Sequence, residues 1–228
     1  MDKFLEIMVG LLQGFGNTFI LFAITLVVSI PLGFLISFGA MSKIKPLKGF
    51  IKVFVWIIRG TPLMLQLLFL TFVPKYIFGT SVKAWAGALG TTVANTNFII
   101  VCIGFIVNYA CYFSEIFRAG IQSIPKGQNE AGKVLGLTKG QIFSKVVLLQ
   151  VIKRTLPPIS NEAITLVKDT VLAFTLSVVD LLTSAQEMVT ISGTLVPFIV
   201  ATVFYLVFNG ILTLIFARLE KKLSYFKE

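Results

Sequence analysis

The sequence predicts an all-α, polytopic membrane protein with about five transmembrane helices and further helices on the cytoplasmic side. The chain of 228 residues is 56% hydrophobic and 13% charged, whereas a soluble domain carries about 25% charged residues. Sixteen of its 20 Lys and Arg residues fall in three clusters beside apolar runs, at 43–59, 118–154 and 218–227. Basic residues gathered in this way are typical of the cytoplasmic ends of membrane spans. We therefore expect a single transmembrane domain over residues 1–228.

Five apolar stretches are long enough to cross the membrane hydrocarbon, which takes about 20 helical residues. We expect spans at 15–41, 53–74, 96–118, 157–176 and 194–217. The second span contains Arg59-Gly60-Thr61-Pro62, and Pro62 removes a backbone donor, so we expect a kink or a break there. Pro157 and Pro158 are expected to open the fourth span, because a proline at a helix start costs little.

Two connections are expected on the outer side. Residues 75–95 are rich in Gly, Thr and Ala, and we expect an outer loop with a short interfacial helix around Trp85. Residues 178–193 mix apolar and polar side chains and are expected to form a re-entrant or interfacial piece. Five spans with the basic clusters inside place the N-terminus outside and the C-terminus in the cytoplasm. Because the basic residues cluster in this way, we attribute the net charge of +10 to membrane topology and lipid contact rather than to nucleic-acid binding.

The longest polar interval is a predicted cytoplasmic loop at 119–155. It is expected to hold a short helix, a glycine break at Gly136 and a second, basic helix. One interpretation is a docking surface for a soluble partner, and another is a merely solvated basic loop. A phosphate loop is a third, because residues 127–133 fit G-x-x-x-x-G-K. That motif needs Ser or Thr next, where this chain has Val134, and no β-rich run precedes it, so we favour docking.

The same interval carries a family resemblance. Glu130, Ala131 and Gly136 stand where the EAA loop of ABC-transporter permeases has its motif residues. The segments 53–69 (with RGTP-x-x-x-Q), 112–128 and 156–180 resemble further blocks of the polar amino-acid permeases. The resemblance covers nearly the whole chain. Gly132 departs from it by replacing the second alanine of the motif.

The resemblance implies a type I ABC importer fold in a bacterial cell membrane, with transport by alternating access. The implied partners are a second permease subunit, identical or homologous, two ATPase subunits, an extracytoplasmic substrate-binding protein and an amino-acid substrate. ATP and magnesium would bind the ATPase, so we expect no cofactor in this chain and no enzyme activity. Glu130 is expected in the first turn of a short helix. The implied ATPase-coupling residues are Glu130, Ala131, Gly132, Leu135, Gly136 and Leu137.

Polar and ionisable groups within a bilayer are costly, so each one is a functional hypothesis. We expect a polar cavity at the subunit interface that holds an amino-acid zwitterion. Its candidate residues are Gln66, Asn108, Glu115, Glu162, Lys168 and Asp169. The alternative is that these groups satisfy one another, with Arg59 paired to Glu115, Lys168 paired to Asp169, and the amides serving as interhelical glue.

The same pattern leaves two alternative functions open. An ion-gradient-driven carrier or channel is the main alternative, and a membrane scaffold is a third. The chain has no His, the commonest metal ligand and general base, so neither a metal site nor a catalytic site is expected. Cys102 and Cys111 are too far apart along one predicted helix, at about 13 Å, to form a disulfide.

Overall fold

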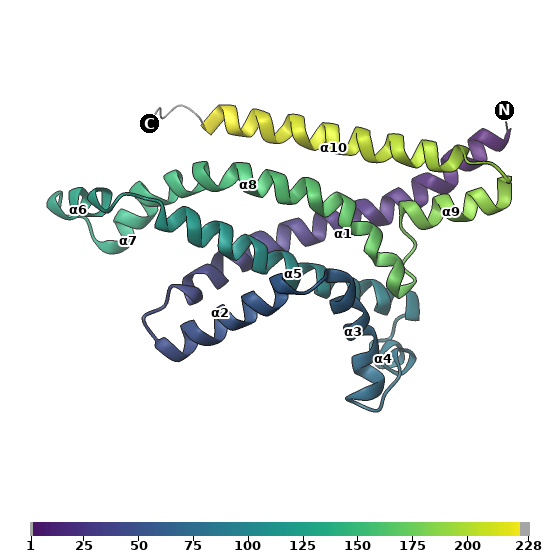
Figure 1. Ribbon diagram of the computed structural model, residues 1–228, viewed down its shortest axis with the longest axis horizontal. Coiled ribbons are helices and arrows are strands. Elements are labelled where there is room, and N and C mark those ends of the chain that lie inside the picture. The colour runs from purple at the N-terminus through teal and green to yellow at the C-terminus, as the bar shows by residue number, and fades with distance from the viewer. Residues whose placement is uncertain (1, 224–228) are drawn as a thin grey trace.

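Two long apolar helices, α1 (Asp2–Ala40) and α5 (Val93–Gln122), lie at the centre of the fold (Figure 1). The computed structural model describes residues 2–223, and every regular element within that range is a helix, which confirms the predicted class. Both helices extend beyond the predicted spans. The end of the predicted basic tail, at 224–228, lies outside the described residues.

α1 and α5 approach each other closely because one face of α1 carries small side chains. A Cβ atom at Gly33 would lie 2.7 Å from Cβ of Phe113 and 2.8 Å from the carbonyl oxygen of Ala110, both on α5. Three fully buried hydroxyl residues, Thr25, Ser29 and Ser37, lie on the same helix, with Gly33 midway between the last two, so small residues recur at every fourth position. Small residues let membrane helices pack at short range, so this pair forms the platform on which the other helices rest.

The second predicted span is broken. The helix axis bends by 106° between α2 (Lys45–Gly60) and α3 (Leu63–Tyr76). The break falls at Thr61, which is extended (φ −119°, ψ 144°), and at Pro62, which has no N–H to continue the helix. α3 then packs against α5.

A short helix follows within residues 75–95, as predicted. α4 (Val82–Ala88) contains Trp85, whose Nε1 donates a hydrogen bond of 2.7 Å to Oγ1 of Thr80. Ser81 caps the helix by accepting a hydrogen bond from the backbone N–H of Ala84.

After α5 the chain turns through one short helix and then forms a single helical run without interruption. The run passes from an α-helical turn through a π-helical turn into a long α-helix and ends in a 3₁₀ segment. The elements are α6 (Lys126–Val134), then α7 (Lys139–Ile142), η1 (Phe143–Val147), α8 (Leu148–Asp169) and η2 (Thr170–Leu176).

The prediction that Pro157 and Pro158 open the fourth span is wrong, because both lie inside α8. An interior proline removes a backbone hydrogen bond, but membrane helices tolerate it when neighbouring groups satisfy the freed carbonyls. Packing sets the helix here: α8 contacts α5 and α10, and Oγ of Ser160 donates to Glu220 of α10 at 3.0 Å.

The chain closes with a short helix and a long one. α9 (Leu181–Ser192) has 12 residues, or about 18 Å, and is too short to cross a bilayer. Its backbone lies so close to α1 that a Cβ atom at Gly14 would meet Ser184 and the carbonyl of Asp180. α10 (Val196–Leu223) then runs beside α8.

Within residues 2–223, three helices, α1, α5 and α10, are long and apolar enough to span a membrane, and the bent α2–α3 pair makes a fourth if it counts as one span. The remaining predicted span, the fourth, corresponds to α8. Its 22 residues reach about 33 Å, but it is not among the apolar candidates, since it carries charged side chains: Lys153, Arg154, Glu162, Lys168 and Asp169.

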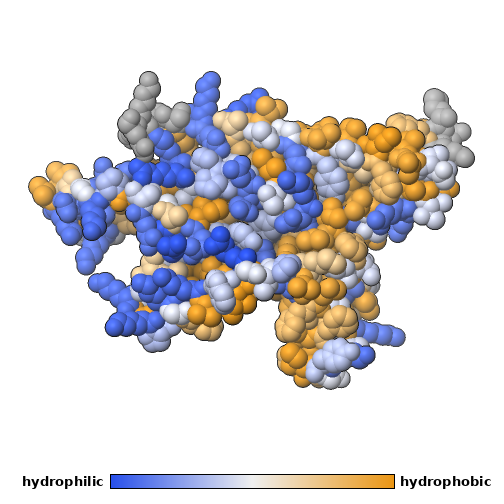
Figure 2. Space-filling view, viewed as in Figure 1, coloured by the Kyte–Doolittle hydropathy of each residue, from blue (hydrophilic) through white to orange (hydrophobic). Residues whose placement is uncertain are grey.

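The basic clusters gather toward one end of the molecule. Figure 1 places α6, the α1–α2 connection and the C-terminal end of α10 at the left. Hydrophilic side chains gather there on the face shown in Figure 2, whereas apolar side chains cover much of α3 and the right-hand part of α10.

Packing of α1 on α5 yields the first prediction. Gly33→Val should destabilise the protein by about 1–3 kcal/mol, because the added side chain meets backbone atoms of α5 that cannot rotate away. The measurement is the thermal unfolding temperature of the purified, detergent-solubilised protein. Gly16→Ala is the control, since no atom lies within 4 Å of that position. An unchanged unfolding temperature for Gly33→Val would contradict the close packing.

Candidate functional site

A cavity of about 370 Å³ lies where the broken span meets α5 and α8. The break contributes Thr61, Pro62 and Leu63, and the other walls come from one face of each helix. The remaining lining residues are Asn108, Tyr109 and Tyr112 of α5, Glu162, Thr165 and Asp169 of α8, and Leu172 of η2. The break therefore forms one side of the cavity, and α5 and α8 form the other sides.

Two carboxylates give this cavity its charge. The hydroxyl of Tyr109 donates a hydrogen bond of 2.7 Å to Oδ2 of Asp169, which fixes that carboxylate against α5. Glu162 lies two turns earlier on α8 and is partly exposed to the cavity. Among the described residues, no Lys or Arg lines this cavity, although Arg59 lies over the ring of Tyr112, which does line it. A positively charged group would find complementary charge at the two carboxylates.

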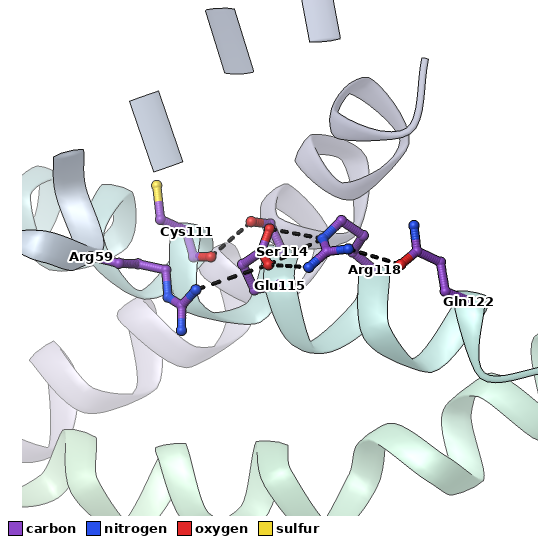
Figure 3. A network of polar contacts seen from close by, with 6 residues as sticks. All are labelled: Arg59, Cys111, Ser114, Glu115, Arg118 and Gln122. Atoms are coloured by element: carbon purple, nitrogen blue, oxygen red, sulfur yellow. Dashed lines mark hydrogen bonds and ion pairs between the residues drawn. The ribbon is translucent and has the colours of Figure 1, made fainter. Parts of the chain in front are cut away.

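A second polar group lies nearer the basic end of α5 (Figure 3). Glu115 is held by Arg118 of the same helix, with the shortest contact 2.6 Å between Oε2 and Nη2. Arg59 of α2 approaches the same oxygen at 4.0 Å and lies over the ring of Tyr112 at 5.1 Å. Glu115 thus links the end of α2 to α5: it pairs with Arg59, as the alternative interpretation expects, and more closely with Arg118.

These residues border a second cavity of about 490 Å³. Arg59, Glu115, Arg118 and Arg154 all line it. Nη1 of Arg154 donates to the carbonyl oxygen of Ser123 at 2.6 Å, so α8 is tied to the end of α5 at this point.

The structure divides the six predicted pathway residues. Asn108, Glu162 and Asp169 line the first cavity, and Glu115 lines the second. Gln66 and Lys168 line neither. Sequence reasoning did not select Tyr109, Tyr112, Thr61 or Arg118 for the site. Only Arg118 carried a local signal, because it stands one turn after Glu115, where oppositely charged side chains on a helix meet.

The predicted coupling segment is α6 with the turn that follows it. Gly136 is left-handed (φ +72°), as expected from its place after the helix. Its N–H bonds the carbonyl of Lys133 at 2.9 Å, and the N–H of Leu137 bonds the carbonyl of Gly132 at 3.0 Å. This is the Schellman pattern of helix ends, so the sharp turn depends on glycine at this position.

Gly132 has a separate role in the same segment. It is buried, and a Cβ atom there would lie 2.7 Å from Cγ1 of Ile142 on α7. The replacement of alanine by glycine therefore brings α6 close to α7. Glu130 and Ala131 are exposed, together with Leu135, which is 77% exposed.

The expectation that Glu130 lies in the first turn of its helix is wrong. α6 begins at Lys126, directly after Pro125, so Glu130 lies in the second turn. Charge effects of a helix terminus fall off within the first turn. Glu130 is exposed, and the helix dipole contributes little at its position.

The segment is also joined to the central helices. Phe143, in the π-helical turn, packs edge-on against Phe38 of α1 with ring centroids 5.6 Å apart. Phe34 contacts Phe143 and Phe117 in turn, so a continuous aromatic cluster connects α7–η1 with α1 and α5.

Comparison with known proteins identifies the class. Residues 29–225 match the family described as "Binding-protein-dependent transport system inner membrane component". The chain belongs to this family, and it is a multi-pass membrane permease component of a transport system.

Individual relatives agree. The chain is 35% identical to the L-cystine transport system permease protein TcyB of Bacillus subtilis, over 85% of this chain and 77% of TcyB. It is 31% identical to the arginine transport system permease protein ArtQ of the same organism, over 94% of this chain and 92% of ArtQ. The histidine/lysine/arginine/ornithine permease protein HisM of Escherichia coli is 30% identical, over 92% and 87%.

Solved structures share the fold. A crystal structure of an amino acid ABC transporter with histidines superposes with a TM-score of 0.81 at 27% identity, covering 96% of each chain. The inward-facing MetNI methionine ABC transporter superposes with a TM-score of 0.65 at 18% identity, covering 95% of each chain, and at that identity it supports the fold alone.

Proposed function

We propose that this chain forms half of the translocation pathway of an ATP-driven importer for a polar or charged amino acid. The observation that carries the proposal is the cavity at the helix break, where Asn108, Glu162 and Asp169 face one space. Polar groups are costly within a membrane unless they serve a pathway or one another. The permeases named for cystine, arginine and basic amino acids to which the chain is similar support the substrate class.

A second permease subunit would complete the pathway, and an extracytoplasmic binding protein would deliver the substrate. Two ATPase subunits would supply the energy. Residues 127–133 of this chain fit a phosphate-loop pattern, but they are helical within α6 and cannot wrap a phosphate as a loop would, so ATP would bind elsewhere. ATP and magnesium would bind those partners. Closure of the ATPases would move α6 and swing the spans between outward- and inward-open states.

The charge of the cavity favours a cationic substrate. An amino-acid zwitterion needs one carboxylate for its ammonium group, and the cavity offers both Glu162 and Asp169 without a lining Lys or Arg. The second carboxylate would suit a basic side chain, because opposite charges in a site of low dielectric attract strongly. Arginine is therefore the first amino acid to test, with glutamine as the neutral comparison.

The second prediction concerns these carboxylates. Glu162→Gln and Asp169→Asn should each raise the arginine concentration needed for half-maximal stimulation of ATP hydrolysis. A hydrogen bond to a charged group contributes about 1.5–3 kcal/mol, or roughly 10- to 150-fold in affinity. The measurement uses the assembled complex with its binding protein in proteoliposomes.

Glu187→Gln is the matched control, because it removes a carboxylate from an exposed position on α9. Normal arginine stimulation in both cavity variants would contradict the proposed site. Gradient-driven uptake by the chain without any ATPase would instead identify a secondary carrier.

The third prediction concerns docking of the ATPase on α6. Gly136→Val should disrupt the turn, because a β-branched residue rarely adopts positive φ, and Ala131→Asp should place a charge where the partner must desolvate it. Both variants should insert in the membrane normally but lose copurification with the ATPase. Gly127→Ala, at an open position of the same helix, is the control, and full ATPase recovery by both variants would exclude α6 as the dock.

We further propose that the end of the molecule bearing the basic clusters faces the cytoplasm, with the N-terminus outside and the C-terminus inside. The gathering of these clusters at one end supports this orientation.

The fourth prediction tests the orientation with introduced cysteines. Lys139→Cys should resist an impermeant thiol reagent applied to intact cells, whereas Thr91→Cys should react. The unsubstituted chain is the control, since Cys102 and Cys111 are buried. Labelling at position 139 from outside would reverse the proposed topology.

A further inference from the structure

The broken span leaves backbone carbonyls without their helical partners. In an uninterrupted helix the carbonyl of residue 58 accepts from the N–H of residue 62. Residue 62 is a proline and has no N–H, so the carbonyl of Ile58 has no backbone donor at that position. An unsatisfied carbonyl within a bilayer costs several kcal/mol, and the break therefore needs another donor.

The side chain of Gln66 supplies that donor. Its Nε2 donates to the carbonyl oxygen of Ile58 at 2.7 Å, to the carbonyl oxygen of Thr61 at 3.1 Å and to Oγ1 of Thr61 at 2.9 Å. Its two N–H groups are thus shared among three oxygens at the end of α2 and the start of α3. Thr61 adds a second repair, because its hydroxyl donates to the carbonyl of Ile57 at 2.9 Å.

The other end of the same amide is held by α5. Nδ2 of Asn108 donates to Oε1 of Gln66 at 3.0 Å, and Asn108 is only 4% exposed. Oxygen acceptors on one side of the Gln66 amide and an amide donor on the other allow only one orientation of the group. The break is therefore joined to the central helix through one chain of hydrogen bonds.

We propose that Gln66 is a positioning residue that holds the α2–α3 break open and fixed against α5, with Asn108 orienting its amide. The group is named here the break clamp: Thr61, Gln66 and Asn108. Gln66 does not line the cavity, but Thr61, Pro62 and Leu63 do, so the break clamp sets the position of one cavity wall. The consequence for transport depends on the proposed function, whereas the geometry of the break does not.

The experiment measures that geometry without substrate. Spin labels at Lys52→Cys and Lys75→Cys, two exposed positions on either side of the break, report their separation by pulsed electron resonance in the assembled complex. Gln66→Ala should lose the narrow distance distribution of the parent. Asn108→Asp should do the same, since its carboxylate cannot donate to Oε1 of Gln66. Single-label samples identify distances that arise from a second copy.

Gln186→Ala is the matched control, because it removes the same amide from an exposed position on α9 and should leave the distribution unchanged. Arginine-stimulated ATP hydrolysis is measured in parallel. An unchanged distribution in Gln66→Ala overturns the proposal, and if arginine stimulation is nevertheless lost, Gln66 is a substrate contact instead. If Gln66→Ala broadens the distance distribution but keeps arginine-stimulated ATP hydrolysis, the break clamp is supported. Transport would then not depend on it.

A second variant covers the case in which Gln66→Ala fails to fold. Gln66→Met keeps the length of an unbranched side chain but has no N–H group for the carbonyl of Ile58, so it should also lose the narrow distance distribution. A narrow, unchanged distribution in Gln66→Met would overturn the proposal.

Discussion

A lipid bilayer offers no water to the backbone groups inside it, and this constraint governs the break in the second span. Where α2 ends, the side chains of Thr61 and Gln66 bond the carbonyls that the break exposes. Beyond the membrane the chain uses ordinary local devices, such as the Schellman turn at Gly136. The irregular backbone thus stays inside the spans only where side chains complete it.

Close packing of α1 on α5 makes this arrangement possible. Gly33 lets the two backbones approach, and α5 then presents Asn108 and Tyr109 toward the break and toward α8. Tyr109 fixes Asp169, and Asn108 fixes Gln66, so adjacent residues of one helix set two walls of the same cavity. Gly33 of α1, on which α5 packs, therefore contributes to a site that it does not line.

Much of the fold could be predicted from the sequence because its signals are local. Apolar runs, the RGTP break, the helix around Trp85 and the left-handed Gly136 each depend on a few neighbouring residues. The course of α8 could not be predicted in the same way. Pro157 and Pro158 favour a helix start locally, but packing on α5 and α10 carries the helix through them.

The candidate site was predicted less completely, for a related reason. Polar residues within spans mark a site, and Asn108, Glu162 and Asp169 do converge on one cavity. Their partners lie far away in the chain, as with Tyr109 and Asp169, and no spacing rule reveals such pairs. Glu115 illustrates the opposite case, since its main partner, Arg118, is one helical turn away.

The uninterrupted helical run from α7 to η2 has a consequence for the evolution of the chain. Residues near its start pack against α6 through Ile142, and residues near its end carry the cavity carboxylates. Each residue of an α-helix adds about 100° of rotation, so inserting or deleting one residue between these points would turn the carboxylates away from the break. The π-helical turn at η1 closes its ring with one residue more than an α-helical turn. It therefore sets the rotation of one end relative to the other about the helix axis. The run should tolerate substitutions far better than insertions or deletions.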